Sequence, residues 1–350
     1  SKYNMSNRSC IYYFGGSEMG MNVTIKDVAK AAGVSKSTVS RVFSNSGNYS
    51  DETKRKVLEA AERLNYRKNT IATAMKTKET KNLGLIIYKK HKPILSHPFY
   101  APIVEAIVDS SKERGYSIII ATDQDIENSA AESLLEKRVD GIIFTSFIHE
   151  AIIKKCKEMG LPLVLLNCSM DLDVTFIKAD DYMGAYEAVV YLIKKDYTEI
   201  GFLCGSLQNH SYYERYRGYL AALNDYNIPV REKFMRFGES TISEGTRLMN
   251  SMLESGDVPR AIFASCDMMA IGAIKAIKKA GLKIPDDVAV IGFEDIEHNV
   301  LIEPALSTVF VDKVKMGQMA VDVLLDQIGE KPKSRRENIL PSKLILRESS

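Results

Sequence analysis

The run Gly33–Phe43, GVSKSTVSRVF, carries basic and hydroxyl side chains at a spacing suited to polar recognition. A guanidinium can make a bidentate contact with guanine or hold a phosphate, and short hydroxyl side chains let the backbone approach a polar surface closely. The side chains concerned are Ser35, Lys36, Ser37, Ser40 and Arg41. The run therefore favours contact with phosphates and base edges.

The charge of the chain is unevenly distributed. The net charge is only +2, but residues 22–80 hold 12 Lys or Arg against 6 Asp or Glu. Such a basic block indicates a polyanion partner, although an ordinary solvated basic surface would have the same composition.

The elements around this run are predicted to be three short helices. Thr24 and Asp27 have the spacing of a helix N-cap, and the apolar residues that follow recur at helical intervals. They are Ile25, Val28, Ala29 and Ala32. Gly33 then allows a tight turn because it has no Cβ atom.

A second helix is expected to begin after Ser35 as its N-cap, with Val39 and Val42 buried and the polar side facing outward. A third helix is expected to open at Ser50 and to bury Val57, Leu58, Ala61 and Leu64. Two helices joined by a tight turn, with an exposed polar second helix, form a helix-turn-helix, which fits the roughly 12 Å wide major groove of DNA.

Two stretches, VTIKDVAKAAGVSKSTVSRVFS and SDETKRKVLEAAERLNYRKNTIATAM, resemble the headpiece of the lactose/galactose repressor family of bacterial transcription regulators. The resemblance implies operator contacts, with Lys36 and Ser37 at the most variable specificity positions. The positions that it implicates are Thr24, Lys36, Ser37, Thr38, Ser40 and Arg41. We add Ser35, which caps the same helix, to the predicted interface.

The segment Asn69–Lys76, NTIATAMK, is too short to be stable as a helix by itself. An isolated helix needs roughly 12 residues or more in water. In the family, this segment becomes helical only when two subunits meet on DNA, where an apolar side chain enters the minor groove. Met75 stands at that wedge position, and Asn69 and Lys76 in the same segment are also predicted to contact DNA. The alternative is that Met75 packs on the next domain.

The rest of the chain alternates apolar runs with amphipathic stretches such as Phe99–Arg114. This alternation predicts parallel sheets covered on both faces, and so many strands fit two doubly wound lobes better than one sheet. The expected strands are Leu83–Tyr88, Ser117–Ala121, Gly141–Phe144, Leu163–Asn167, Ile200–Cys204, Ala261–Ala264 and Val288–Gly292. The ligand site is expected in the cleft between the lobes.

The motifs RVDGIIF, ADDYMG, ERYRGYLAAL, CDMMAIGAIKAIKKAGLKIPDDVAVIGFEDIE and PALSTV resemble the effector-binding core of the same family, which is similar to periplasmic sugar-binding proteins. The resemblance makes Arg215 and Asp267 the polar effector ligands, and Phe99 or Tyr100 the stacking aromatic. An ordinary core role would explain Phe99 and Tyr100 equally well. A salt bridge between lobes or a helix cap would also explain Asp267. Asp180 is a further candidate, although an Asp before a helix is typically a cap.

Other features of the sequence exclude several classes of protein. No nucleophile elbow, phosphate-binding loop or His-Glu-x-x-His pair occurs, so we predict no enzyme, no catalytic residue, no metal and no cofactor. The five scattered Cys residues predict reduced thiols in the cytoplasm. No apolar run approaches the roughly 20 residues that span a bilayer.

The predicted fold class is a small all-α helix-turn-helix DNA-binding headpiece plus an α/β two-lobed periplasmic-binding-protein-like effector domain. The predicted divisions are an N-terminal extension (1–21), the helix-turn-helix (22–68), the hinge helix and linker (69–80), and the effector and dimerisation domain (81–350).

The predicted function is a homodimeric repressor of a carbohydrate-utilisation operon, with double-stranded operator DNA and a sugar or sugar phosphate as partners. Two alternatives stay open: a catabolite-control regulator governed by a partner phosphoprotein, and a sugar-binding module without operator function. Ser240, where some relatives present an aromatic platform, mildly favours a sugar over a purine. The sequence decides neither the effector nor the sign of its effect.

Overall fold

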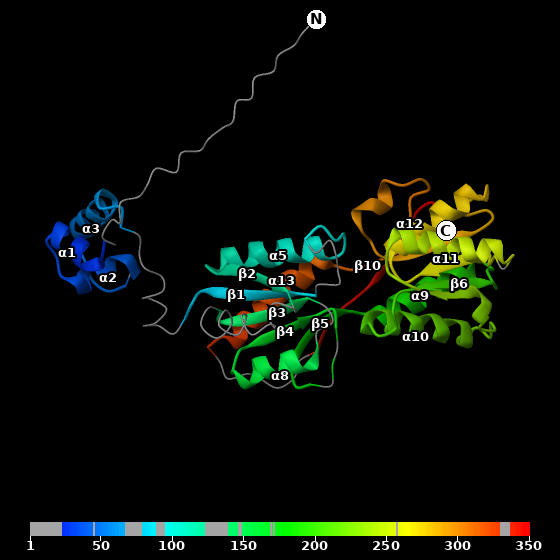
Figure 1. The fold of residues 1–350 in the computed structure, drawn as a ribbon, viewed down its shortest axis with the longest axis horizontal. Helices are drawn as coiled ribbons and strands as arrows, with labels where there is room; N and C mark the ends of the chain where they lie inside the picture. The colour runs from blue at the N-terminus through cyan, green and yellow to red at the C-terminus, as the bar shows by residue number, and fades with distance from the viewer. Residues whose placement is uncertain are drawn as a thin grey trace, which may run out of the picture. The chain divides into compact units, whose positions relative to one another are not determined.

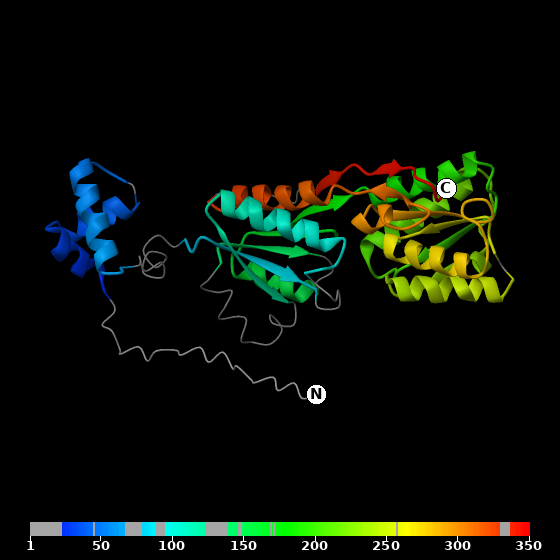
Figure 2. The same ribbon diagram turned by 90° about the horizontal axis from the view of Figure 1, so that it is seen from above.

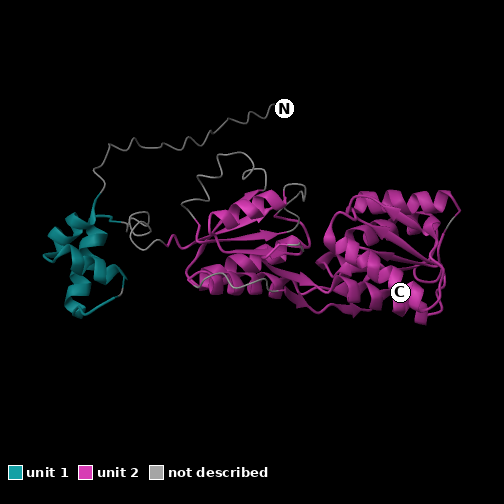
Figure 3. Cartoon of the chain, turned by 90° about the horizontal axis from the view of Figure 1, so that it is seen from below, with its two compact units in different colours: residues 1–78 teal, residues 79–350 magenta. Residues whose placement is uncertain are grey.

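The structure is a computed structural model of the 350-residue chain, and it describes residues 23–44, 46–66, 79–88, 95–122, 139–145, 149–168, 170, 172–256, 258–329 and 337–350. The chain divides into two compact units, residues 1–78 and 79–350 (Figure 3). The predicted extension (1–21) and the predicted contacts at Asn69, Met75 and Lys76 lie outside the described residues. Within those residues, no helix is both long and apolar enough to cross a membrane.

The first unit contains three helices, α1 (Ile25–Ala32), α2 (Lys36–Ser44) and α3 (Asp51–Arg63). The Asp27 carboxylate accepts from the Thr24 backbone N–H at 2.8 Å. This bond is the reciprocal half of a capping box. Gly33 ends α1 with φ +64°, the left-handed conformation that a residue without a Cβ adopts at low cost. Ser50 caps α3 by accepting from the Thr53 N–H. All three helices begin where the sequence predicts, and α1 ends at the predicted Gly33 turn.

The small core of this unit lies where the three helices meet. It consists of Val28, Ala29, Val39, Val42, Val57, Ala60 and Ala61. The predicted burial of Leu58 is wrong, because its side chain is 45% exposed. Val57, Ala60 and Ala61 share one helical face, and Leu58 lies about 100° around the helix from Val57.

The first lobe of the second unit is a six-stranded parallel sheet covered on both faces (Figure 1). The strand order is β11-β5-β4-β3-β1-β2, with α5 and α13 on one face and α8 on the other. The strands are β1 (Asn82–Ile87), β2 (Ser117–Thr122), β3 (Gly141–Thr145), β4 (Leu163–Leu166), β5 (Thr175–Ala179) and β11 (Glu337–Leu340). The helices are α5 (Tyr100–Glu113), α8 (Glu150–Glu158) and α13 (Lys313–Gln327).

The second lobe repeats this plan, with α9 and α10 on one face of its sheet and α11 and α12 on the other (Figure 1). The strand order is β12-β10-β9-β8-β6-β7, and only the edge strand β12 pairs antiparallel. The strands are β6 (Ile200–Cys204), β7 (Met235–Phe237), β8 (Ala261–Ala264), β9 (Ala289–Glu294), β10 (Ser307–Phe310) and β12 (Lys343–Ile345). The helices are α9 (Asp181–Lys194), α10 (His210–Asp225), α11 (Ile242–Glu254) and α12 (Asp267–Lys279), with short turns η1 (Glu232–Phe234) and η2 (Glu297–Val300).

Within the part of the chain that the structure describes, the backbone passes between the lobes after β5, after β10 and after β11 (Figure 2). Two crossings are bonded to each other: the Asp180 N–H donates to the Leu340 carbonyl at 2.9 Å, and the Ser342 hydroxyl donates to the Asp180 carbonyl at 2.9 Å. Asn167, which follows β4 in the first lobe, and Glu294, which ends β9 in the second, line one pocket.

Gly218 sets the close approach of α10 to α9. A Cβ atom at this position would lie 2.3 Å from the Tyr182 carbonyl oxygen and 3.0 Å from the Ala185 Cβ. We therefore expect Gly218→Ala to lower the free energy of unfolding by about 1–3 kcal/mol through overpacking, although alanine is the better helix former. Urea unfolding followed by circular dichroism measures the change.

Asn224→Ala on the exposed side of the same helix is the matched control. It should leave stability unchanged or slightly raised, because it gains helix propensity without a clash. If Gly218→Ala is as stable as the wild type, α9 and α10 can move apart enough to accommodate the added Cβ atom without loss of stability.

Candidate nucleic-acid interface and effector pocket

The polar side of α2 is formed as the sequence predicts. Lys36, Ser37 and Arg41 are exposed, Ser40 is half-buried, and Val39 and Val42 point into the core. The Arg41 Nε donates to the Ser37 carbonyl at 3.4 Å, which lays the side chain along the helix. Short hydroxyl and cationic side chains thus share one outer surface.

Three other predicted interface residues also hold helix ends. The Ser35 hydroxyl accepts from the Thr38 N–H at 3.1 Å and lies 2.8 Å from the Thr38 hydroxyl. Ser35 therefore caps α2. The Thr24 hydroxyl donates to the Asp27 carboxylate at 2.7 Å. A ligand that used these hydroxyl groups would compete with the caps.

A pocket lies in the crevice between the two lobes. The first lobe contributes His97, Phe99, Tyr100 and Asn167, and the second contributes Asn209, Ser211, Tyr212, Arg215 and Glu294. The Ser211 hydroxyl donates to Asn167 Oδ1 at 3.1 Å and joins the lobes across the pocket. The parallel sheets place these residues together because loops leave the carboxyl ends of their strands here.

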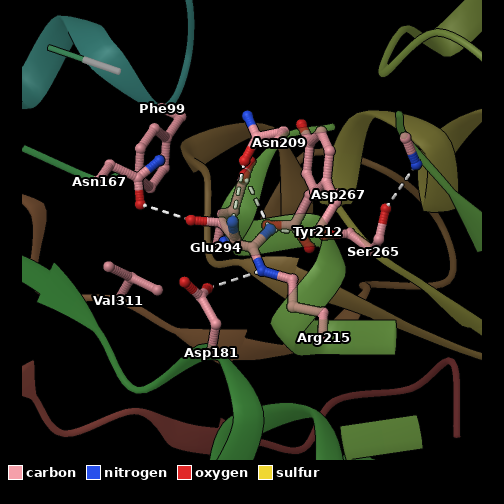
Figure 4. Close-up of polar contacts among 12 residues, drawn as sticks. Phe99, Asn167, Asp181, Asn209, Tyr212, Arg215, Ser265, Asp267, Glu294 and Val311 are labelled. Carbon is pink, nitrogen blue, oxygen red and sulfur yellow. Dashed lines mark hydrogen bonds and ion pairs between the residues drawn. The ribbon is translucent and has the colours of Figure 1, made fainter. Parts of the chain in front are cut away.

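Arg215 is the centre of the polar lining, and its side chain is 1% exposed (Figure 4). Its Nε donates to Asp181 Oδ1 at 2.8 Å, and its Nη1 donates to the Ser265 carbonyl at 2.6 Å and to Glu294 Oε1 at 3.2 Å. The guanidinium carbon lies 3.9 Å from the Phe293 ring centroid, which makes a cation–π contact. Burial opposes the charge, but Asp181 and Glu294 raise the pKa of Arg215 above its ordinary value.

Glu294 ends β9 in an unusual backbone conformation. Its φ is +114°. Non-glycine residues rarely adopt such an angle, which costs on the order of 1–3 kcal/mol. The buried Lys313 ammonium donates to the carbonyl oxygens of Glu294, Asp295 and Val311, which ties this strand end to the crossing before α13. Strain at a pocket residue is typical of a functional position.

The other predicted effector residues lie in different settings. Phe99 and Tyr100 both line the pocket and pack edge to face, with ring centroids 5.0 Å apart. Asp180 caps α9 by accepting from the Met183 N–H, and it is outside the pocket lining.

Asp267 also lies outside the lining, and its carboxylate is bonded within the second lobe. It accepts from the Thr308 hydroxyl at 2.6 Å, the Asn299 amide at 2.8 Å and the Ile296 N–H at 3.0 Å. These bonds hold the segments that follow β9.

Sequence reasoning missed several lining residues. Asn167 and Glu294 follow or end buried strands, and Asn209 is the N-cap of α10. Ligands of such folds bind beside strand ends and helix starts, so these three residues could have been predicted to line the pocket. His97 and Tyr212 gave no such signal, because only the tertiary fold brings them to the pocket.

Glu294 predicts a pH dependence of stability. Burial raises the pKa of Glu294 from 4.5 to about 7, with Arg215 opposing the rise. The folded state therefore binds this proton more tightly than the unfolded chain. The stabilisation is complete below the unfolded pKa and is lost as the pH rises through the folded pKa, up to about 3 kcal/mol in all. Urea midpoints should fall between about pH 4.5 and about pH 7.5, and Glu294→Gln should flatten that fall.

The control is Glu297→Gln, which removes an exposed carboxylate from η2 and should keep the wild-type slope. Some slope should persist in Glu294→Gln, because burial also raises the pKa of Asp267 to about 6. If the urea midpoints of Glu294→Gln fall with pH as steeply as those of the wild type, Glu294 is not the source of the pH dependence.

The fold and the pocket define a two-lobed ligand-binding protein that carries a helix-turn-helix unit. Residues 80–348 match the model of "Periplasmic binding proteins and sugar binding domain of LacI family", and residues 24–69 match "Bacterial regulatory proteins, lacI family". The chain therefore belongs to the LacI family of bacterial regulatory proteins.

Similar proteins extend over the whole described fold. The HTH-type transcriptional repressor PurR of Pasteurella multocida is 32% identical over 333 residues, covering 93% of this chain and 98% of the relative. The probable HTH-type transcriptional repressor ExuR of Bacillus subtilis is 36% identical over 331 residues, covering 93% and 98%. The lac repressor dimer bound to operator and the anti-inducer ONPF superimposes with a TM-score of 0.84 at 28% identity, covering 94% and 99%.

Proposed function

We propose that this protein is a ligand-responsive repressor that binds a near-palindromic operator as a homodimer and controls the use of a carbohydrate. One observation carries the proposal: a single chain joins an exposed polar recognition helix to a two-lobed polar pocket. One recognition helix covers about half of a typical operator, so two-fold symmetry is expected, with half-site centres about one helical turn apart. Such a protein acts in the bacterial cytoplasm, where its operator is.

The coupling between pocket and operator is proposed to run through lobe closure. Lining residues come from both lobes, so a ligand that contacts both stabilises the closed arrangement over the open one. Arg215, Phe99 and Tyr100 are proposed to contact the ligand. Asp267 is proposed to act indirectly, by fixing the segment after Glu294.

The test uses the full chain and an operator selected from random duplexes. Fluorescence anisotropy at several salt concentrations should show sequence-specific binding that weakens steeply with salt, and one member of a sugar panel should change that affinity. Tyr212→Phe and Asn209→Ala should alter the response to the sugar while leaving binding to DNA intact. If no sugar affects operator binding but a phosphoprotein strengthens it, the proposal that the repressor responds to a small ligand is wrong. The catabolite-control alternative is then favoured.

A further inference from the structure

A cluster of buried charged groups lies along and behind the pocket: Arg215 and Glu294 line it, and Asp181, Asp267 and Lys313 lie outside the lining. Arg215 faces two carboxylates, Asp181 at 2.8 Å and Glu294 at 3.2 Å, and the side chains of all three are at most 7% exposed (Figure 4). Lys313 and Asp267 also act electrostatically on Glu294, so with every carboxylate ionised the cluster has three negative charges against two positive ones. Lys313 and Asp267, the next charged groups, are both bonded away from the lining.

The polar atoms of Arg215 and the two carboxylates that remain without a bond are one donor and two acceptors. Among the described residues, Arg215 uses Nε and Nη1, and no bond to Nη2 is found. Glu294 uses only Oε1, which leaves Oε2 as an acceptor beside that donor. Asp181 Oδ2 is buried and accepts from none of the described residues.

A ligand must form hydrogen bonds with these atoms without bringing further negative charge into the pocket. A hydroxyl group both donates and accepts, so neighbouring hydroxyls can meet Nη2 and Oε2 together. A phosphate monoester or a carboxylate offers only acceptor oxygens, and it would meet Glu294 with like charge in a buried setting where such charge is poorly screened. Asn167 and Asn209 add amides to the lining, and amides suit a neutral polyol equally well.

We propose that Asp181 and Glu294 make this pocket selective for uncharged polyhydroxyl ligands and exclude phosphorylated and carboxylated ones. The inference rests on the proposed function only in taking this pocket as the effector site. It narrows the expected effector from a sugar or sugar phosphate to a neutral sugar or polyol. The two carboxylates are thus specificity-determining residues that work by repulsion.

The test measures ligand binding by the full chain in the absence of DNA. Phosphorus NMR line broadening reports on inorganic phosphate, and saturation-transfer NMR compares neutral sugars with their phosphate monoesters. Both are recorded above the pKa of about 7 that burial gives Glu294. The wild type should not broaden the phosphate signal, and any sugar that binds should bind about tenfold or more tighter than its phosphate monoester. Glu294→Gln combined with Asp181→Asn should gain phosphate binding by a similar factor.

Two variants keep the test decisive. Glu294→Gln alone is nearly isosteric and replaces the double variant if the latter fails to fold, while Glu297→Gln removes an exposed charge nearby and should behave as the wild type. Phosphate binding by the wild type, or variants as indifferent to phosphate as the wild type, would overturn the proposal. A chain that binds no operator would refute the proposed regulatory function and leave this ligand measurement unaffected.

Discussion

Arg215→Ala is expected to lower the free energy of unfolding of the second unit by about 3–5 kcal/mol. The substitution removes the only cation bonded to the carboxylates of Asp181 and Glu294 among the described residues and leaves both of them buried without their partner. It also frees the Ser265 carbonyl and exposes the Phe293 face that the guanidinium covers. Removing one partner of a buried ion pair is far more costly than removing an exposed one.

Arg217→Ala is the matched control on the same helix. Arg217 pairs with Glu214 at 3.0 Å, but its side chain is 51% exposed. Its loss should therefore cost no more than about 1 kcal/mol. Urea unfolding at about pH 8 and at about pH 5.5 measures both variants. The penalty of Arg215→Ala should shrink at the lower pH, because protonation of Glu294 removes one unpaired charge. Equal midpoints for the two variants would show that the buried cluster does not depend on Arg215.

Arg41→Ala is expected to weaken binding to the selected operator by about 1–3 kcal/mol, roughly 5- to 150-fold. Arg41 is exposed on the outer side of α2 and is held along that helix by its bond to the Ser37 carbonyl. Anisotropy titrations on the operator and on a scrambled duplex should be made across a salt series. A guanine contact would be lost on the operator alone, whereas a phosphate contact would weaken both duplexes and reduce the salt slope by about one.

Arg63→Ala tests whether any loss of positive charge has the same effect. Arg63 is exposed at the end of α3 and has the same charge as Arg41, but it is outside the predicted interface. Its loss should change operator affinity by no more than about threefold, the size of a weakly screened surface charge. Equal losses in Arg41→Ala and Arg63→Ala would indicate that the unit binds DNA through its net charge alone.

The helices of the first unit could be predicted because their signals are local. Caps at Thr24, Ser35 and Ser50 and the turn at Gly33 lie within a few residues of the helix ends that they define. The predicted burial of Leu58 is wrong, because its side chain is exposed and the helical period places it off the face that Val57 and Ala61 share.

The seven predicted strands of the second unit were likewise correct to within two residues, because each is an apolar run between breakers. The strands that escaped prediction include β7 (Met235–Phe237) and β11 (Glu337–Leu340), which are half-exposed and lie at sheet edges. Edge strands bury less surface, so their sequences carry a weaker apolar signal.

The pocket could be predicted only in part, because its chemistry comes from contacts between distant segments. Arg215 was expected there, but its partners Asp181 and Glu294 lie 34 and 79 residues away in the chain. Asp181 directly follows Asp180, and nothing local in the sequence distinguishes the residue that caps the helix from the residue that binds the guanidinium.

The three crossings between the lobes have a consequence for building hybrid regulators. Each lobe is assembled from separate stretches of chain, so exchanging one lobe with that of a relative needs three matched splice points. Asp180 and Leu340 are hydrogen-bonded to each other and must be exchanged together. The DNA-reading unit needs only one splice near residue 78. New operator specificity can therefore be grafted onto this sensor in a single step, whereas a new ligand response is more readily obtained by changing side chains within the existing crevice.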